Sequence, residues 1–225
     1  MYNLQHNNYH QKPKSSTIYT PPAVSQFIFG ILNPSLYWKE YDYDHPKAFQ
    51  KKSLIFDPCS GENSLLKPWQ VAGYQIWGND SNSQLLKQQI PHSDLDFLMS
   101  EKYMWNNYFS QQEPSLVLCN PPFNGYGKQL GSEVWLDKII ELFGKEVPIV
   151  LFTPMGFRLN SKKSGKRWSK FIQDHYPPIN SIISLPRDIF PAVEFHSEIL
   201  IFNLPNLQPH YFFHPTNQIE QRTPI

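Results

Sequence analysis

The stretch SLIFDPCSGEN, residues 53–63, decides the fold. Its first half is a short apolar run without alternation, which is typical of a strand buried on both faces of a sheet. A tight turn follows from Asp57 to Gly61, and residues 64–73 then carry a helical pattern. Such a unit brings backbone N–H groups toward a ligand at the carboxyl edge of the sheet. Taken alone, it is also compatible with an ordinary strand-to-helix connection.

The same pattern continues along the chain. Four further apolar runs of four to seven residues follow, at residues 74–80, 95–98, 115–120 and 148–153. The stretches between them, such as residues 81–90 and 132–144, are long enough for crossover helices and carry apolar residues three and four apart. This alternation predicts an α/β fold with a parallel sheet.

Both ends of the folded part depart from this pattern. The order Thr-Pro-Pro at residues 20–22, followed by apolar residues at helical spacing, predicts a helix over residues 22–32. Residues 38–52 lack a clean period and predict a loop. The strand-like runs at residues 180–190 and 197–204 are too close together for a parallel crossover, so we expect them to pair antiparallel.

Composition sets the class of protein. The chain has 225 residues, 40% of them apolar, and a formal net charge of +1, which fits one globular core and excludes binding of nucleic acid by bulk charge alone. Polar residues 1–16 predict a flexible tail, residues 17–204 the folded domain, and residues 205–225 an extended appendage. The sequence contains no membrane-spanning run, no signal-peptide pattern and only two cysteines, so we expect a cytoplasmic protein without membrane contact.

A second motif, Asn120-Pro121-Pro122-Phe123, ends the apolar run at residues 115–120. Consecutive prolines stop a strand and stiffen its backbone, so they hold the Asn120 side chain at the carboxyl edge of the sheet. An Asn oxygen and a backbone carbonyl can accept both N–H bonds of an exocyclic amine and leave its lone pair free to attack. The Phe123 ring offers a face for a base, a contact of about 1–3 kcal/mol. The plainer interpretation is an Asn-Pro turn that ends a strand.

The motifs occur in a recognisable order. They are Tyr19-Thr20-Pro21, Asp57-Pro58-Cys59-Ser60-Gly61, Asn120-Pro121-Pro122-Phe123, and a late pair from Leu185-Pro186 to Ile199-Leu200-Ile201-Phe202. Together they resemble the N6-adenine DNA methyltransferases, most closely the methylation subunits of type I restriction-modification systems, over about residues 18–204. The resemblance implies a Rossmann-like, S-adenosylmethionine-dependent methyltransferase fold, with a mostly parallel seven-stranded sheet and an antiparallel last strand.

The resemblance also implies S-adenosylmethionine as the cofactor. Its methionine end would lie against Tyr19, Thr20, Pro21, Asp57, Pro58, Cys59 and Gly61. Asp80 would accept the ribose hydroxyls, and Asp96 and Phe97 would meet the adenine ring. Asn120, Pro121, Pro122 and Phe123 would form the catalytic turn, in which Asn120 and the Pro121 carbonyl bind the target amine and Phe123 stacks on the base. Taken alone, Asp80 and Asp96 are typical strand-end carboxylates, and only their register with the motifs assigns these roles.

One departure from the family pattern lies in the first motif. Glu62 and Asn63 stand where the family often has a second glycine. Asparagine tolerates a left-handed backbone better than most residues, so we expect the turn to be kept. Glu62 adds negative charge near the expected cofactor site.

A third feature is the basic segment SKKSGKRWSK, residues 161–170. It predicts a loop at the active edge whose cations contact phosphates, and a solvated basic loop is the equal alternative. The candidate nucleic-acid contacts are Arg158, Lys162, Lys163, Lys166 and Arg167. His196-Ser197-Glu198 matches the H-x-E of zinc deaminases, but the chain has no P-C-x-x-C, and we therefore assign no metal.

Taken together, the sequence predicts methyl transfer to the N6 amino group of adenine in nucleic acid, with DNA favoured over RNA and the base flipped out of a duplex. The alternatives are an RNA adenine or protein glutamine methyltransferase, or a catalytically silent subunit that binds nucleic acid or an active partner. The tails are too short for a target-recognition domain, so we expect a specificity subunit, a sister subunit or short loops to supply any sequence preference.

Overall fold

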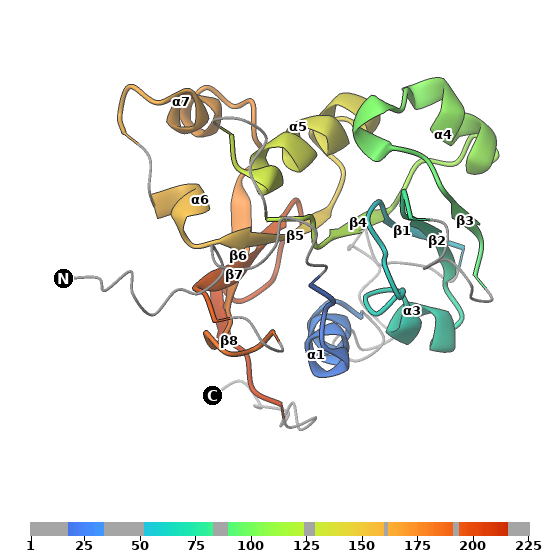
Figure 1. The fold of residues 1–225 in the computed structure, drawn as a ribbon, viewed down its shortest axis with the longest axis horizontal. Helices are drawn as coiled ribbons and strands as arrows, with labels where there is room; N and C mark the ends of the chain where they lie inside the picture. The colour runs from blue at the N-terminus through green and yellow to red at the C-terminus, as the bar shows by residue number, and fades with distance from the viewer. Residues whose placement is uncertain are drawn as a thin grey trace.

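The apolar runs form the centre of one sheet. The computed structural model describes residues 18–33, 52–82, 90–123, 129–159, 162–190 and 194–215. Its strands are β1 (Leu54–Asp57), β2 (Gln75–Asn79), β3 (His92–Ser93), β4 (Leu116–Cys119), β5 (Ile149–Pro154), β6 (Ile179–Ser184), β7 (Ser197–Phe202) and β8 (His210–Phe212). They make an eight-stranded sheet in the order β3-β2-β1-β4-β5-β7-β6-β8 (Figure 1).

The parallel half of the sheet has β1 at its centre. Strand β1 pairs in parallel with β2 on one side and with β4 on the other, and every residue of β1 and β4 is buried. The chain therefore winds outward in both directions from the boundary between β1 and β4. In open α/β sheets, ligands bind beyond the carboxyl ends of the strands at such a switch point. The turns after Asp57 and Cys119 both lie there.

The other half of the sheet contains the reversed strand. Strand β7 runs antiparallel to both β5 and β6, between which it lies. The expected antiparallel pairing of the two late runs is therefore confirmed, as is the mostly parallel sheet. The structure adds one strand that the sequence did not predict. Strand β8 lies within residues 205–225, which the sequence predicts as an appendage, and pairs in parallel with β6.

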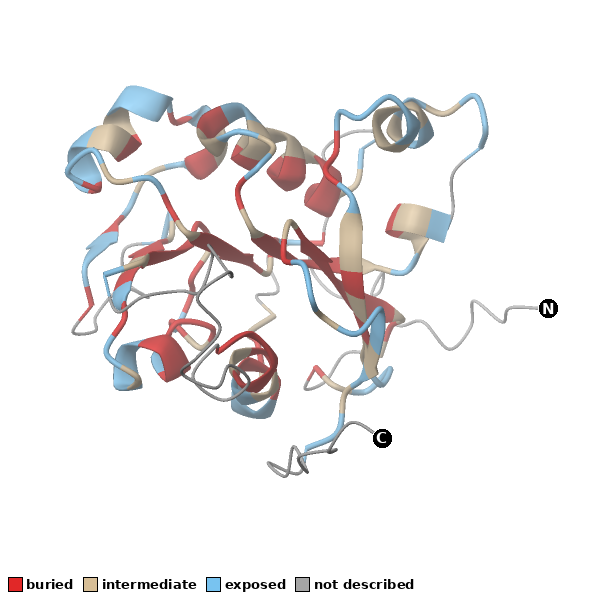
Figure 2. Cartoon of the chain, turned by 180° about the vertical axis from the view of Figure 1, so that it is seen from behind, coloured by how far each residue is buried: buried red, intermediate tan, exposed pale blue. Residues whose placement is uncertain are grey.

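Helices cover both faces of this sheet. Helices α1 (Pro22–Leu32) and α3 (Lys67–Val71) lie on one face, and α4 (Lys102–Tyr108), α5 (Gly131–Phe143) and α7 (Lys166–Ile172) on the other (Figure 1). The short helix α6 (Gly156–Leu159) follows β5. Figure 2 shows that burial concentrates in the central strands and on the helix surfaces toward them.

Alternation along β1 splits the core into two clusters. Ile55 packs in the cluster with Val24 of α1 and Trp69 of α3. Phe56, one residue on, packs in the cluster with Trp105 and Leu136 on the opposite face. Because successive strand residues point to opposite faces, one apolar run serves both layers.

The prediction of a strand at residues 95–98 is wrong. Strand β3 is only His92–Ser93, and Phe97–Met99 forms a 3₁₀ helix. The cause is a side chain of the neighbouring strand: Asn79 accepts a hydrogen bond from the Leu95 N–H and donates one to the Leu95 carbonyl. Backbone groups held this way cannot extend the ladder.

Several expectations fall outside the described residues. These are the tail at residues 1–16, most of the loop at residues 38–52 and most of the helix expected at residues 81–90. Within the described ranges, no helix has the length and apolar character needed to cross a membrane.

Candidate functional site

The turn after β1 is built around Asp57. This residue ends the strand, is only 1% exposed, and its Oδ1 accepts a hydrogen bond from the Cys59 N–H at 3.0 Å. Burial raises the pKa of the Asp57 carboxyl from 3.8 to about 8, and the nearby charge of Asp80 adds to the rise while the bond from Cys59 opposes it. A carboxyl group with this pKa is mostly protonated at pH 7 and gains a charge when a cation approaches.

Asp80 closes the same turn from the end of β2. Its Oδ2 accepts from the Gly61 N–H at 2.9 Å, and its Oδ1 accepts from the Asn82 N–H at 2.9 Å. Each carboxylate oxygen keeps a second lone pair that can accept a hydroxyl hydrogen. The structure thus brings Asp57, Gly61 and Asp80 together at one edge of the sheet, as the sequence predicts.

Gly61 has a conformation and a position that no other residue would fit well. Its φ is +50°, and a Cβ built there would lie 3.0 Å from the ring of Tyr19. The turn is therefore left-handed and packed closely under the N-terminal segment. Asn63 also has a positive φ, of 62°, which confirms the expectation that asparagine keeps the turn. Glu62 is exposed.

Asn79, which the sequence pattern does not single out, connects the turn after β1 with the segment after β3. It is completely buried, and its Nδ2 donates to the carbonyls of Pro58 and Leu95 at 3.0 and 3.1 Å. Its Oδ1 accepts from the Ser93 hydroxyl at 2.8 Å and from the Leu95 N–H at 3.1 Å. A polar residue that ends an otherwise apolar strand beside Asp80 is a signal that could have identified it.

The turn after β4 carries an unpaired acceptor. The Nδ2 of Asn120 donates to the Oγ1 of Thr20 at 2.9 Å. The Oδ1 of Asn120 is buried and has no hydrogen-bond partner among the residues that the structure describes. A buried acceptor without a partner costs about 1–3 kcal/mol, which is a reason to expect a ligand for it.

Phe123 lies in a different environment from the one its predicted role suggests. It is 7% exposed, and its ring meets the rings of Phe195 and Phe190 edge-on, with centroids 5.0 and 6.2 Å away. In this structure it is part of the core cluster under α1. Stacking on a target base stays a prediction.

The two residues expected at the cofactor's adenine ring differ in their exposure to solvent. Asp96 is exposed, and its Oδ1 accepts from the Leu98 N–H at 3.1 Å as a cap of the 3₁₀ helix. Phe97 is buried and stacks on Trp135, with ring centroids 5.1 Å apart and planes at 14°. Both roles stay predictions.

The basic segment differs from the predicted loop because α7 begins inside it, at Lys166. The arginine of the segment, Arg167, and Arg158 just before the segment are both held by carboxylates. Arg158 forms a two-pronged ion pair with Glu198 at 2.8 and 2.9 Å, and Glu198 is 2% exposed. Arg167 pairs with Glu133 at 3.3 Å. These arginines therefore bind α6 to β7 and α7 to α5.

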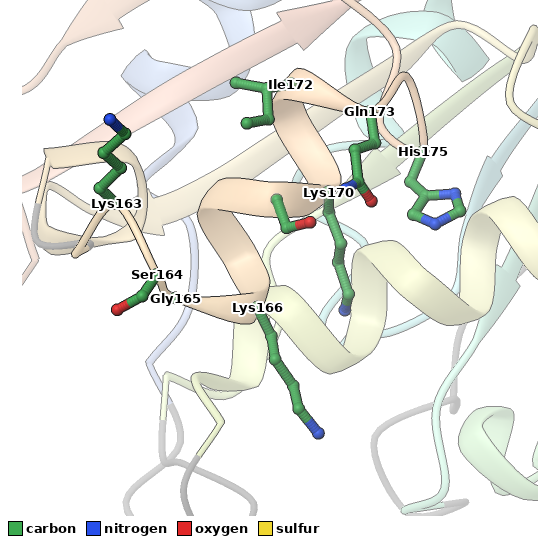
Figure 3. Close-up of a pocket in the computed structure, with 9 residues that line it drawn as sticks. Lys163, Ser164, Gly165, Lys166, Lys170, Ile172, Gln173 and His175 are labelled. Atoms are coloured by element: carbon green, nitrogen blue, oxygen red, sulfur yellow. The ribbon is translucent and has the colours of Figure 1, made fainter.

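Three of the four lysines of the segment remain at the surface, and the fourth, Lys170, is ion-paired with Glu133 and Asp137. Lys162, Lys163 and Lys166 are exposed. Lys163 and Lys166 line a pocket of about 490 Å³ on α7, with His175 and the neutral side chains of Ser164, Ser169 and Gln173 nearby (Figure 3). Phosphate contact by these lysines stays a prediction.

Two thiols lie between the two turns. Cys59 and Cys119 are free cysteines with their sulfur atoms 3.7 Å apart. Burial raises the pKa of both thiols.

No group of three side chains suited to hold a metal ion occurs in the described part of the chain.

Solved structures show which fold this is. One is a Listeria monocytogenes protein assigned to the class I S-adenosylmethionine-dependent methyltransferases, with a TM-score of 0.56 and 14% identity over 86% of this chain. A second is the methyltransferase subunit of a type I restriction-modification system from Streptococcus thermophilus, with a TM-score of 0.57 and 16% identity over 88% of this chain. The chain has the class I methyltransferase fold. The Rossmann-like fold implied by the sequence motifs is therefore confirmed.

The methyltransferase fold also occurs in the type IIG restriction endonuclease BpuSI, with a TM-score of 0.58 and 17% identity over 86% of this chain. The chain spans 64% of the Listeria protein, 48% of the Streptococcus subunit and 26% of BpuSI. No protein-family model matches the sequence, and no curated protein is significantly similar to it.

Proposed function

We propose that the protein is an S-adenosylmethionine-dependent methyltransferase that modifies the N6 amino group of adenine in DNA. The observation that carries this proposal is the Oδ1 of Asn120, a buried acceptor without a partner among the described residues. It stands at the end of β4, next to the turn of β1, where methyltransferase-fold proteins are expected to bind ligands.

The residues present fit the cofactor. Gly61 packs so closely under Tyr19 that only a glycine leaves the turn in place, and Asp80 orders the same turn while keeping lone pairs for hydroxyl hydrogens. S-adenosylmethionine carries positive charge at its methionine end and, when bound, supplies an electrophilic methyl group. Asp57 lies at that end and gains its negative charge when a cation is near.

The catalytic turn acts by holding the amine. The Oδ1 of Asn120 and the carbonyl of Pro121 would accept hydrogen bonds from the two N–H groups of the amine, which leaves its nitrogen lone pair free to attack. Pro121 and Pro122 keep these acceptors fixed, and the rate gain comes from proximity and from hydrogen bonds already in place. A bound S-adenosylmethionine would supply the methyl group to this nitrogen, which would then give up one proton to solvent.

The polymer is assigned from the resemblance to adenine DNA methyltransferases together with the surface lysines. Lys163 and Lys166 line one pocket and are exposed, so they can contact phosphates without losing an internal partner. One of the structures that share the fold is a subunit of a type I restriction-modification system. By analogy, we propose that a partner subunit supplies sequence specificity to this protein.

A second candidate is a silent methyltransferase fold that binds nucleic acid or an active partner. The packing of Phe123 against Phe195 and Phe190 favours it, because this ring would have to leave the core to stack on a base. Methylation of RNA adenine or of a glutamine side chain uses the same Asn120 chemistry and differs only in the acceptor.

Transfer of a radiolabelled methyl group to separate pools of DNA, RNA and protein distinguishes these candidates. We expect label in DNA with the wild-type chain and with Asn107→Ala, a control asparagine exposed on α4. Asn120→Ala should lower transfer by about 100-fold or more while cofactor affinity, measured by calorimetry, is retained. Label in RNA or protein alone would move the assignment to that polymer. Cofactor binding without label in any pool would favour the silent subunit.

A further inference from the structure

The contact between Thr20 and Asn120 joins parts of the chain that are 100 residues apart. Thr20 is 6% exposed, and its Oγ1 accepts the hydrogen bond from the Asn120 Nδ2 at 2.9 Å. Thr20 immediately precedes Pro21, whose carbonyl accepts bonds from the N–H groups of Val24 and Ser25 in the first turn of α1. Val24 is completely buried in the core, so the first turn of α1 anchors the backbone next to Thr20.

The orientation of an asparagine side chain decides its chemistry. One end of the amide carries two donors and the other end is an acceptor, and a half-turn about the last bond exchanges them. With Nδ2 held by Thr20, Oδ1 points the other way, and it is the atom left without a partner in the described structure. With the amide reversed, two N–H donors would face the N–H donors of an incoming amine, and no hydrogen bond could form.

We propose that Thr20 is a positioning residue for the methyl acceptor: its hydroxyl accepts a hydrogen bond from the Asn120 Nδ2 and so holds this side chain in the place from which Oδ1 faces the substrate amine. This inference rests on the proposed function. It also gives Thr20 a role different from the cofactor contact that the sequence resemblance implies.

The neighbouring residue gives this segment a second contact. Tyr19 lies against Gly61 in the cofactor turn, where its ring would be 3.0 Å from any added Cβ. Residues 19 and 20 therefore connect the turn of β1 with the turn of β4. Tyr19 contacts the cofactor side and Thr20 the amine side, so the two roles can be separated by substitution.

Three variants test the proposal. Thr20→Val keeps the shape and removes the hydroxyl, whereas Thr20→Ser keeps the hydroxyl. Thr153→Val is the matched control, because Thr153 is the other fully described buried threonine and its Oγ1 has no partner in the described ranges. We expect Thr20→Val to lower kcat for methyl transfer by about 100-fold, with cofactor Kd unchanged and the thermal midpoint lowered by only about 2–4 °C. Thr20→Ser and Thr153→Val should stay within about threefold of wild type.

The hydrogen bond between Asn120 and Thr20 is measured by NMR, without any need for turnover. The side-chain ¹⁵N–¹H₂ signals of Asn120 are identified by their loss in Asn120→Ala. We expect a pair with a shifted, exchange-protected proton in the wild type and in Thr20→Ser, and loss of both properties in Thr20→Val. The NMR measurement tests the role of Thr20 even if the wild-type chain methylates nothing. Absence of methylation would contradict the proposed function but not the hydrogen bond between Thr20 and Asn120.

Two results would overturn the positioning role. If Thr20→Val lost cofactor affinity in proportion to its transfer rate, Thr20 would be a cofactor contact. If its transfer rate and its Asn120 signals both matched the wild type, the hydroxyl would have no influence on the amide.

Discussion

Asp57 is the residue whose charge state should govern binding of the proposed cofactor. Burial raises the pKa of its carboxyl to about 8, so a proton must leave before the group can attract a cation at neutral pH. The affinity for S-adenosylmethionine should therefore rise with pH, by up to about tenfold per unit, and level off near pH 8. Calorimetry between pH 6 and pH 9 measures this rise.

The matched variant is Asp57→Asn, which cannot ionise. We expect it to bind the cofactor more weakly and with no pH dependence over the same range. A wild-type affinity that is flat between pH 6 and pH 9 would remove Asp57 from the cofactor site.

The sequence predicts the site residues well where they follow a strand and poorly where they depend on distant partners. Asp57, Asp80 and Asn120 each end a buried run, so parallel pairing brings them to one edge. The partners of Arg158 and Arg167 are 40 and 34 residues away, and no local pattern points to them. The sequence therefore predicts both arginines as phosphate contacts, whereas in the fold each one is ion-paired with a carboxylate.

At the scale of the elements, the pair Arg158–Glu198 holds α6 to β7. Its carboxylate is almost fully buried, so removal of the guanidinium leaves a buried charge without a partner. We expect Arg158→Met to lower the free energy of unfolding by about 3 kcal/mol, and Arg158→Met with Glu198→Leu to restore much of it. Urea denaturation of both variants measures the difference. Normal stability with weakened DNA binding would instead support the phosphate contact.

The lysines on α7 should behave in the opposite way. Lys163 and Lys166 are exposed, so Lys163→Ala and Lys166→Ala should leave stability within about 0.5 kcal/mol of wild type. Each should weaken DNA binding and reduce the slope of log K against log salt by about 1. Fluorescence anisotropy over a salt series tests this, and unchanged slopes would show that DNA binds elsewhere. Lys67→Ala on α3 is a suitable control, because Lys67 is also exposed and its helix lies on the opposite face of the sheet.

Elements with continuous apolar runs could be predicted, and those shaped by side chains could not. Strands β1, β4 and β5 are buried along nearly their whole length, and the sequence shows it directly. The 3₁₀ helix at Phe97–Met99 arises because Asn79 binds the backbone of Leu95. Strand β8 has three residues of mixed exposure, which leaves no periodic signal.

At the scale of the molecule, the topology assembles the site from the ends of distant segments. The reversal of strand order between β1 and β4 places the two turns side by side, and the segment before α1 adds Thr20 from the start of the described chain. The chain corresponds to between about a quarter and two thirds of the length of the Listeria, Streptococcus and BpuSI proteins. We therefore expect sequence preference to be supplied in part by segments or subunits beyond this fold.

The central claim is methyl transfer to the N6 nitrogen of adenine by the turn that contains Asn120. It is tested most directly by mass spectrometry of nucleosides from DNA incubated with the protein and S-adenosylmethionine that carries a trideuteromethyl group. The account predicts trideuteromethyl N6-methyladenine with the wild type and with Asn107→Ala, and none above background with Asn120→Ala. Label on another nucleoside, or equal labelling by Asn120→Ala, would contradict it.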